Sequence, residues 1–426
     1  MNIFSYSNFK NSIGIILLWI GPPLIYFLKG YSSLGSGSVF TGICYFLGIL
    51  LMLNDTPIKI GYKPNLLLFQ VGISFLIISI FYFIFYNGDK GSFNSEIINF
   101  VFLSLYLLFL LKAKNSIQGY LPIIILFFTL ITNLALIYSI STNPAYVIGS
   151  RATVQFKSAT GDFAGNPHMY SRNGLAGFII SILVIFKNDL TLWLKNSALV
   201  RLAAHANLWI SLLVIVLTQT RVTFISLIIV MLAILIFVFP FKSFFKVTHW
   251  YVVGFYMSIF YYLNVLNNRY SFVELINNYF NSFLGLVYKA LNTGLKLGKN
   301  DDVDDSAMGR VSNFNYFIEL WNDNPMNFLF GFGYRFRYID IPVLESFINF
   351  GFIGFLLYLS FNIILLVYSI KAFKSNSIFQ IFLGLFYLHT FLAIFSSGRP
   401  LDFTYWIAFL VYIRFLGIKD NELNIS

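Results

Sequence analysis

Arginine is the residue type in this sequence best suited to chemistry, because its planar guanidinium binds phosphate and carboxylate groups in a bidentate manner. Eight of the ten arginines fall in segments that the hydropathy pattern places on one side of a membrane, whereas twelve of the eighteen lysines fall on the other. This bias indicates a polyanionic partner, such as a diphosphate, on the arginine-rich side. The alternative is that these arginines pair with nearby acids or with lipid headgroups. The eight are Arg151, Arg172, Arg221, Arg269, Arg310, Arg335, Arg337 and Arg399.

The elements that must position these arginines are membrane-spanning helices. Apolar residues make up 58% of the 426-residue chain and charged residues only 11%, and the mean hydropathy is +0.77. A soluble domain carries about a quarter charged residues, so this composition excludes a soluble enzyme, a disordered protein and a nucleic-acid binder. The single cysteine, Cys44, excludes an intramolecular disulfide. The expected fold is an all-α polytopic membrane protein in which residues 1–426 form a single integral membrane domain.

Runs of about 20 apolar residues without charges predict helices that cross the hydrocarbon core, because lipid offers the backbone no hydrogen-bond partners. The sequence contains twelve such runs. With the N-terminus in the cytoplasm, the short inside loops carry most of the lysine and arginine, as the positive-inside bias requires. We therefore expect both termini in the cytoplasm. The predicted spans are residues 12–28, 36–53, 65–86, 96–111, 121–140, 173–186, 202–217, 222–240, 249–266, 344–370, 378–395 and 403–417.

Two predicted outer loops are long enough to hold functional groups. The first covers residues 141–172, and the second covers residues 267–343, between the ninth and tenth spans, where it is large enough to form a cap. Apolar residues at helical spacing predict an amphipathic helix over 272–286 in the second loop. A further helix is predicted over 311–321, ending before Asn324, which precedes a proline. The large loop is therefore expected to contain short helices.

The charge distribution argues against transport and against a nucleic-acid partner. The inside segments hold fourteen basic and four acidic residues (+10) and the outside segments fourteen and thirteen (+1), so the basicity follows from topology. No charged residue lies near the middle of a span, whereas ion-coupled transporters keep ionisable groups at membrane depth. The sequence has no Walker loop, no HExxH and no clustered His and Cys, and the acidic run at 301–305 lacks the glycine and glutamate of an EF-hand. No metal and no cofactor are predicted.

Four local patterns lie at the outer ends of predicted spans. They are GNPHMYSRNG at 165–174, LTQTRVTF at 217–224, GRVSNFNYFIELWNDNPMNFLFGFG at 309–333, and DIPVLESFINFGFIGF at 340–355. In this order and at these positions they resemble the O-antigen polymerase and ligase superfamily, whose members have about twelve spans and a large penultimate outer loop. The ligases resemble one another in a histidine at the position of Asp340. Because this chain has an aspartate in place of that histidine, it looks most like a Wzy-type O-antigen repeat-unit polymerase.

The resemblance is carried by individual residues. In the first pattern Asn166 and Pro167 match the family, and His168 stands where an asparagine is usual. In the fourth pattern the glycine register places Asp340 at the position of the family histidine and Ile341 at that of the following asparagine. The other matching residues are Arg221, Arg310, Pro325, Gly331, Gly333, Gly351 and Gly354.

The resemblance implies a reaction that joins two oligosaccharide repeat units, each carried on undecaprenyl diphosphate, at the periplasmic face of the bacterial inner membrane. Arginines are implied to bind the diphosphate, with no metal or other cofactor. The implied partners are the lipid-linked donor and acceptor, membrane lipids and a chain-length regulator protein. Two alternatives stay open: an O-antigen ligase that transfers glycan to the lipid A core, and a non-enzymatic flippase of lipid-linked oligosaccharide.

The predicted catalytic base is a carboxylate at the outer end of the tenth span. A sugar hydroxyl must lose its proton as the new bond forms, and Asp340 is the first candidate for accepting or orienting it. Glu345 is the second candidate. The alternative is that Asp340 pairs with Arg335 or Arg337 and only fixes the loop.

The predicted cationic groups are arginines of the outer loops. Arg221, on a tight turn between two spans, and Arg310, expected near a helix N-terminus, are the first candidates for stabilising the leaving diphosphate. The residues predicted to bind diphosphate or sugar are Arg151, Arg172, Arg335, Arg337, His168 and Tyr334.

Overall fold

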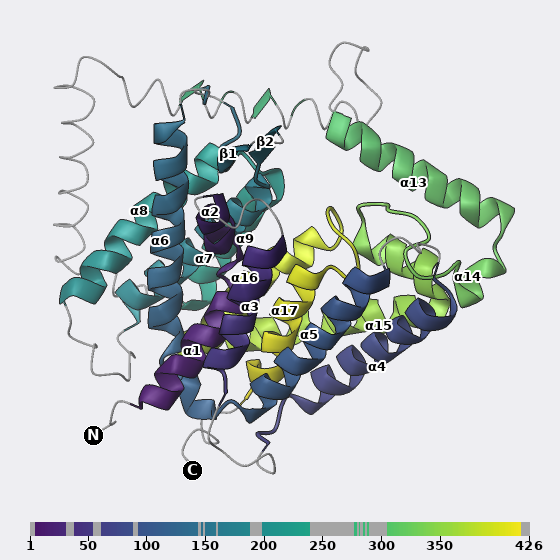
Figure 1. Cartoon of the computed structure of the whole chain (residues 1–426), viewed down its shortest axis with the longest axis horizontal. Coiled ribbons are helices and arrows are strands. Elements are labelled where there is room, and N and C mark those ends of the chain that lie inside the picture. Colours follow the sequence, from purple (N-terminus) through teal and green to yellow (C-terminus); the bar gives the residue numbers. More distant parts are fainter. Residues whose placement is uncertain are drawn as a thin grey trace.

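The computed structural model describes residues 5–30, 38–53, 61–87, 93–143, 146–147, 150–158, 161–187, 198–238, 277–278, 281, 284–285, 288 and 305–418. These residues form a bundle of α-helices with one two-stranded antiparallel hairpin (Figure 1). The helices are α1 (Tyr6–Trp19), α2 (Pro22–Gly30), α3 (Ser38–Leu51), α4 (Leu66–Phe85), α5 (Phe93–Lys112), the 3-10 helix η2 (Asn115–Gly119), α6 (Leu121–Thr142), α7 (Pro167–Phe186), α8 (Ala198–Thr218), α9 (Arg221–Ala233), which continues as the π-helical turn η3 (Ile234–Val238), α13 (Asp305–Asp323), α14 (Asn327–Phe330), α15 (Pro342–Ala372), α16 (Ile378–Ala393) and α17 (Phe403–Phe415). The strands are β1 (Gln155–Ser158) and β2 (Gly161–Ala164).

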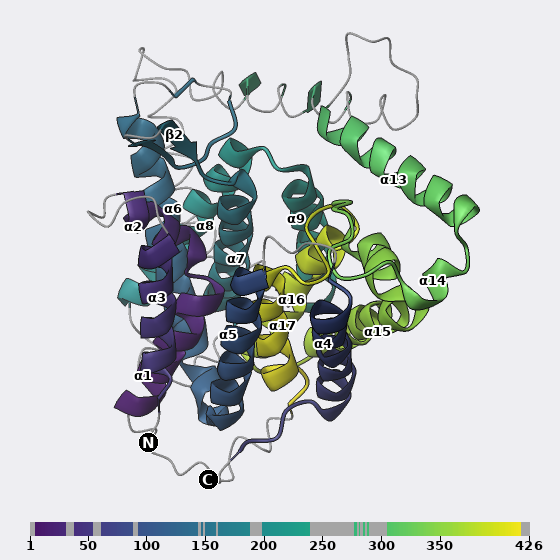
Figure 2. The ribbon, with the colours of Figure 1, turned by 45° about the vertical axis from the view of Figure 1, so that its right-hand side comes forward.

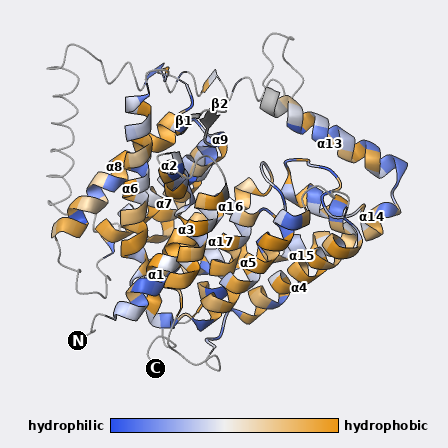
Figure 3. Cartoon of the chain, viewed as in Figure 1, coloured by the Kyte–Doolittle hydropathy of each residue, from blue (hydrophilic) through white to orange (hydrophobic). Residues whose placement is uncertain are grey.

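Seven of the described helices are long and apolar enough to cross a membrane, or eight if α1 and α2 form one span. They are α4 to α9 and α15, and Figure 3 shows how apolar residues cover their surfaces. Ile77 and Phe81 of α4, for example, are large apolar side chains exposed on the outside of the bundle. Such surfaces are stable in lipid and not in water. The chain is therefore a helical multi-pass membrane protein.

The number of spans is less closely defined. Three of the predicted spans correspond to the shorter apolar helices α3, α16 and α17, which have 14, 16 and 13 residues. The predicted ninth span, 249–266, lies outside the described residues. The total of twelve stays a prediction.

Two predicted spans are not continuous helices. The run 12–28 is divided into α1 and α2, which are bent by 75° relative to each other, because Pro22 and Pro23 have no N–H to continue the hydrogen-bond ladder of α1. The run 344–370 is interrupted within α15 at Gly351, where φ is 67° and ψ is −166°. Both interruptions correct the expectation that each of these apolar runs is helical throughout.

Antiparallel helices bring distant segments together at one end of the bundle, here called the site end (Figures 1 and 2). At this end the N–H of Tyr334 donates to the carbonyl of Tyr86 at 2.7 Å, and the N–H of Ala152 donates to the carbonyl of Leu217 at 2.9 Å. At the opposite end, Arg414 donates from Nε to the carbonyl of Leu110 at 3.0 Å. Each of these bonds joins segments that are more than 60 residues apart in the chain.

Helix α13 is the described helix that lies outside the bundle, and it lies at the site end. In Figures 1 and 2, α13 stands apart from the bundle above α14 and α15. Its contact with them is a small apolar cluster centred on Phe328, Ile339 and Ile348. The helix expected over 311–321 is present as the longer α13. The helix expected over 272–286 falls almost wholly outside the described residues.

The first predicted outer loop, 141–172, contains more regular structure than the sequence suggested. Strands β1 and β2 pair within it, and Gln155 lies opposite Ala164 in the register. The hairpin is a small exception to the all-α expectation. The loop also ends earlier than predicted, because α7 begins at Pro167.

A buried polar cluster holds α6, α7 and α8 together. The Asn133 amide donates to Ser211 Oγ at 3.0 Å, and Asn173 donates to Asn133 Oδ1 at 2.8 Å. Asn207 donates to Thr129 Oγ1 at 2.9 Å. Hydrogen bonds of this kind stabilise helix packing in membranes, where water cannot satisfy the same groups. The cluster keeps the start of α7 in a fixed position relative to its neighbours.

Candidate functional site

The first sequence pattern, 165–174, forms the start of α7. Asn166 is the N-cap residue, and its side-chain oxygen accepts a hydrogen bond from the N–H of His168 at 2.9 Å. Pro167 is the first helical residue, a position where its fixed φ and missing N–H are favourable. Arg172 consequently lies in the second turn of α7. The sequence analysis had placed it in the outer loop 141–172.

The second pattern, 217–224, forms the turn between α8 and α9. Gln219 occupies the left-handed region with φ of 49°, and Arg221 is the first residue of α9. The hydroxyl of Thr223 donates to Ser171 Oγ at 3.0 Å, which holds the start of α9 against the start of α7. Arg221 therefore lies on a fixed turn between two helices, as predicted.

The third and fourth patterns pack directly against each other through two glycines. Gly331 has φ of 81° and Gly351 has φ of 67°. A Cβ on Gly331 would lie 2.5 Å from the nitrogen of Gly351, and a Cβ on Gly351 would lie 2.6 Å from the carbonyl oxygen of Leu329. The N–H of Phe332 donates to the carbonyl of Ile348 at 2.7 Å. Only glycine permits this approach of two backbones, and the contact coincides with the break in α15.

The next residues of the loop, Tyr334 and Arg335, are bound to Glu96 of α5. The hydroxyl of Tyr334 donates to Glu96 Oε2 at 2.5 Å, and Arg335 Nη2 lies 2.6 Å from Glu96 Oε1. Burial, and then the hydrogen bond to Glu96, raise the pKa of Tyr334 far above its ordinary value. Tyr334 is only 1% exposed, so it presents no ring face to a sugar in this structure. Both residues fix the position of the loop.

Asp340 lies at the end of this loop, two residues before α15. Its φ of 61° is uncommon for a residue with a side chain. Oδ1 accepts hydrogen bonds from the Tyr338 hydroxyl at 2.5 Å and from the Gly398 N–H at 2.9 Å. Oδ2 lies 3.7 Å from Arg310 Nε, which is beyond hydrogen-bond distance. The carboxylate thus pairs with Arg310 rather than with either loop arginine considered from the sequence.

Tyr338 is linked to this carboxylate through its phenol. Partial burial, and then the hydrogen bond to Asp340, raise the pKa of Tyr338 above its ordinary value. The phenol therefore stays protonated and keeps donating to Oδ1.

Glu345 lies in the first turn of α15 and is fully buried. Its Oε2 accepts from the N–H of Ile339 at 3.1 Å, and its Oε1 lies 3.8 Å from Arg399 Nε. The guanidinium of Arg399 also lies 4.8 Å from the centre of the Tyr338 ring. Glu345 therefore binds the backbone at Ile339, one residue before Asp340, and Arg399 contacts the side chain of Tyr338.

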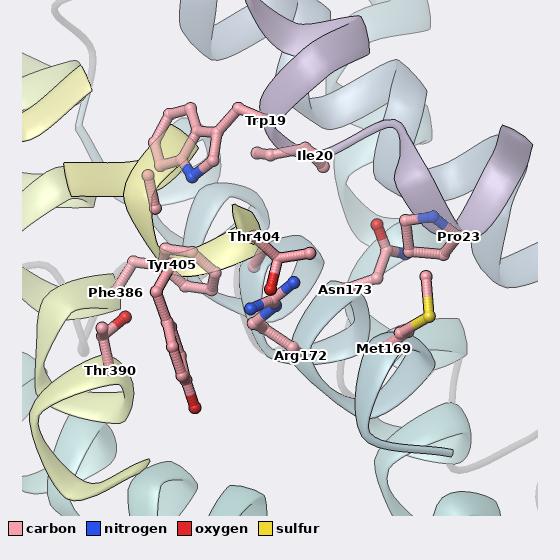
Figure 4. Close-up of a pocket in the computed structure, with 12 residues that line it drawn as sticks. Trp19, Ile20, Pro23, Met169, Arg172, Asn173, Phe386, Thr390, Thr404 and Tyr405 are labelled. Atoms are coloured by element: carbon pink, nitrogen blue, oxygen red, sulfur yellow. The ribbon is translucent and has the colours of Figure 1, made fainter. Parts of the chain in front are cut away.

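Arg172 lines a small pocket between the start of α7, the α1–α2 bend, α16 and α17 (Figure 4). The cavity is about 20 Å³, enough for roughly one water molecule. Figure 4 shows the guanidinium beside Thr404 and Tyr405. Arg172 forms no hydrogen bond or ion pair with the residues that the structure describes. It is a half-buried cation with its donors still available.

Five predicted residues share one electrostatic neighbourhood. The charged neighbours of His168 are Arg151, Arg310 and Arg172, and the one carboxylate among them is Asp340. The Nε of Arg310 is buried and has no hydrogen-bond partner among the residues that the structure describes. The structure therefore collects three cations and one carboxylate from the first loop, α7, α13 and the start of α15. Such an excess of positive charge favours an anionic ligand.

Arg310 itself is placed differently from the prediction. Because α13 begins at Asp305, Arg310 lies in the second turn and not at the helix N-terminus. The interaction between an anionic ligand and the helix dipole is weaker in the second turn than at the helix N-terminus.

Arg337 lies apart from this neighbourhood. Its guanidinium carbon is 3.7 Å from the centre of the Tyr316 ring on α13, and the side chain is exposed.

Among the described ranges, no three His, Cys, Asp or Glu side chains come close enough together to ligate a metal.

Two charged residues that contact the predicted site residues were not identified from the sequence. Glu96 stands alone at the outer end of the predicted fourth span, and such an isolated acid beside lipid requires a partner. Arg399 was counted among the outer arginines without a specific role. The position of Glu96 indicates from the sequence that it needs a partner. The sequence does not identify that partner, because Tyr334 and Arg335 are about 240 residues away in the chain.

Comparison with known proteins gives no match, either to a protein-family model or to a curated protein sequence.

Proposed function

We propose that this protein is an O-antigen repeat-unit polymerase, a glycosyltransferase of the bacterial inner membrane. The observation that best supports this function is the grouping of Arg151, Arg172 and Arg310 near His168, with Asp340 3.7 Å from Arg310, at one end of a membrane bundle. A diphosphate leaving group at membrane level needs fixed cations, and an attacking hydroxyl needs a proton acceptor. Both kinds of group occur in this neighbourhood.

The proposed reaction transfers a growing glycan from one undecaprenyl diphosphate to an incoming repeat unit on another. The C1–O bond to the donor diphosphate breaks, and its electron pair leaves with the diphosphate. A hydroxyl oxygen of the incoming unit forms the new C1–O bond, and the hydroxyl proton passes to Asp340. The glycosyl diphosphate bond supplies the energy.

Asp340 is suited to the role of proton acceptor. Oδ1 is held by Tyr338 and Gly398, which fixes the orientation of the carboxylate. Oδ2 has Arg310 nearby at 3.7 Å but no hydrogen bond, so it retains acceptor capacity. Glu345, which is fully buried, fits better as the residue that positions the loop through Ile339.

The arginines divide the binding of the diphosphate. We assign the diphosphate to Arg172 and Arg310, together with Arg221 on its turn. Arg172 lies in its pocket beside Thr404 and Tyr405, and the Nε of Arg310 has no hydrogen-bond partner among the described residues. Each fixed donor aimed at the developing charge contributes about 10² to 10³ in rate. Arg335 is neutralised by Glu96 and supports the loop.

The proposed orientation places the site end in the periplasm and both termini in the cytoplasm, because lysine is concentrated at the opposite end. The proposed partners are the two lipid-linked oligosaccharides, the surrounding lipids and a chain-length regulator protein. A reporter fused after Asn300 should be periplasmic, and one fused after Lys374 cytoplasmic. The reverse result would overturn this orientation.

Gene deletion and complementation test the function. Deletion should leave surface lipopolysaccharide that carries a single repeat unit. Loss of a ligase would instead leave bare core with accumulated polymer, and loss of a flippase would leave the lipid-linked unit inside the cell.

Complementation with site variants tests the residues. Arg221→Ala and Arg310→Ala should fail to restore long chains, and the corresponding lysine variants should restore them poorly, because lysine lacks bidentate donors. Asp340→Asn should reduce the rate of polymer formation by a factor of about 10² to 10⁴. Arg201→Ala, an exposed arginine of α8 outside the site, is the matched control and should complement fully. Long chains at wild-type rate from all three site variants would refute the proposed site.

A further inference from the structure

A second cavity lies on α13, outside the neighbourhood of Asp340. It is a groove of about 390 Å³ whose polar lining consists of Ser312, Asn315, Tyr316 and Glu319 of α13 and Arg337 of the adjoining loop. The lining residues of α13 recur at intervals of three and four, so they follow one face of the helix. The groove is therefore an elongated feature along α13, not a gap between unrelated loops.

Its lining combines an aromatic ring with donors and acceptors of several kinds. The guanidinium of Arg337 lies 3.7 Å from the centre of the Tyr316 ring. The cation therefore lies over the face of the ring, and its guanidinium carries five N–H donors. Glu319 supplies only acceptors, whereas Ser312 and Asn315 supply both donors and acceptors. Neither Arg337 nor Glu319 forms an ion pair with another described residue.

We propose that this groove binds the saccharide part of a lipid-linked repeat unit, the incoming acceptor. The hydroxyl groups of a saccharide both donate and accept hydrogen bonds, and its C–H faces are apolar. The lining offers hydrogen-bond donors and acceptors for the hydroxyl groups and apolar side chains for the C–H faces. One arginine and one carboxylate leave the groove with no net charge, which disfavours a phosphate group. The proposal rests on the proposed function for the identity of the sugar chain.

The position of the groove suits an acceptor. Its lining extends from Met308 to Glu319, a rise of about 16 Å along the helix. Arg310, which pairs with Asp340, lies within this stretch but on another face of the helix, outside the lining, and Arg337 of the lining lies three residues before Asp340. The groove and the proposed base are therefore carried by the same two segments, on different faces of α13.

The test uses the purified full-length protein in detergent and measures saccharide affinity by saturation-transfer NMR titration. The probe is the oligosaccharide that mild acid releases from the surface polysaccharide of the producing bacterium. Asn315→Ala and Glu319→Gln should each weaken binding at least tenfold. The matched controls are Asn322→Ala and Asp323→Asn, which make an identical and an analogous change at exposed positions of α13 outside the groove, and they should bind as wild type.

Several results would overturn the proposal. Wild-type affinity in both groove variants, or no binding of the oligosaccharide by the wild type, would show that the groove holds no saccharide. Displacement of the oligosaccharide by inorganic diphosphate, with the displacement lost in the groove variants, would identify an anion site instead. Thermal unfolding of each variant shows whether a loss of binding reflects a loss of fold.

The proposed function fails on different evidence. Polymer formation by Arg310→Ala and Asp340→Asn would refute the polymerase site and leave the saccharide titration unchanged. Normal polymer from the groove variants, together with wild-type saccharide affinity, would refute the groove alone.

Discussion

Replacement of Gly351 by alanine should displace the loop that carries the proposed base. The glycine has φ of 67°, and an added Cβ would lie 2.5 Å from the carbonyl carbon of Phe330, 2.6 Å from the oxygen of Leu329 and 2.7 Å from the nitrogen of Gly331. All three are backbone atoms, so no side chain can rotate away to relieve the contact. The two backbones must separate instead.

The energy has two parts. The conformation of Gly351, with φ of 67° and ψ of −166°, is essentially restricted to glycine and is disfavoured for alanine by about 1–3 kcal/mol. Forcing extra volume into a packed contact destabilises by about 1–3 kcal/mol. Together they lower the free energy of unfolding by roughly 2–6 kcal/mol, a large part of the 5–15 kcal/mol typical of a folded protein. Separation also breaks the bonds from Phe332 to Ile348 and from Gly333 to Asn349, at 2.7 and 3.2 Å.

Two measurements test this prediction. Thermal unfolding of purified Gly351→Ala should show a lower midpoint than wild type, and the variant should fail to restore long chains in a deletion strain. Gly309→Ala is the matched control, because a Cβ there meets nothing within 4 Å and alanine favours the helical α13. A Gly351→Ala protein as stable and active as the Gly309→Ala protein would refute the argument that this contact positions the loop.

Three further predictions follow from buried contacts. Glu96→Gln removes the charge that lies 2.6 Å from Arg335 and should lower the free energy of unfolding by about 1–3 kcal/mol, as measured by thermal unfolding in detergent. Gly177→Ala places a Cβ 2.4 Å from Ser211 Oγ in the polar cluster of α6, α7 and α8, and should destabilise by about 1–3 kcal/mol in the same assay. Because the pKa of Tyr334 is raised in the folded state, its contribution to stability is complete below its ordinary value of about 10 and declines as the pH rises further. Wild type should therefore lose stability above pH 10 faster than Tyr334→Phe, and parallel curves for the two proteins would contradict the assignment.

The helical membrane bundle could be predicted from the sequence because its cause is local. A run of apolar residues determines both burial in lipid and the helical backbone, whatever its neighbours are. Helix ends with their own signals were also accessible: Asn166 and Pro167 carry the signature of a helix start, although the predicted sixth span began six residues later.

The breaks and contacts of the site could not be predicted in the same way. Gly351 interrupts α15 because a loop from another part of the chain packs against it, and hydropathy contains no information on that partner. The same applies to Glu96, whose partners Tyr334 and Arg335 are fixed only by the arrangement of α4, α5 and the loop. Sequence patterns located the glycines, while their physical role came from the contact between them.

The arginines show most clearly what three-dimensional contacts add. In the sequence the outer arginines are equivalent, yet their partners differ. Arg335 is paired with a carboxylate at 2.6 Å, whereas the Nε of Arg310 is buried without a hydrogen bond and Arg172 has no partner among the described residues. Arg414, at the opposite end, bonds through Nε and Nη2 and leaves only Nη1 without a partner.

A buried donor that lacks an acceptor destabilises a protein by about 1–3 kcal/mol. This energy is recovered when a ligand supplies the missing acceptor, and a diphosphate offers several oxygens that match a guanidinium. Arg310 combines such a donor with a carboxylate that is near but not bonded, so a ligand can enter between them without first breaking a hydrogen bond. Arg335 would have to give up its contact with Glu96 before it could bind the same ligand. The arginines best suited to hold the diphosphate are therefore those that the protein leaves incompletely bonded.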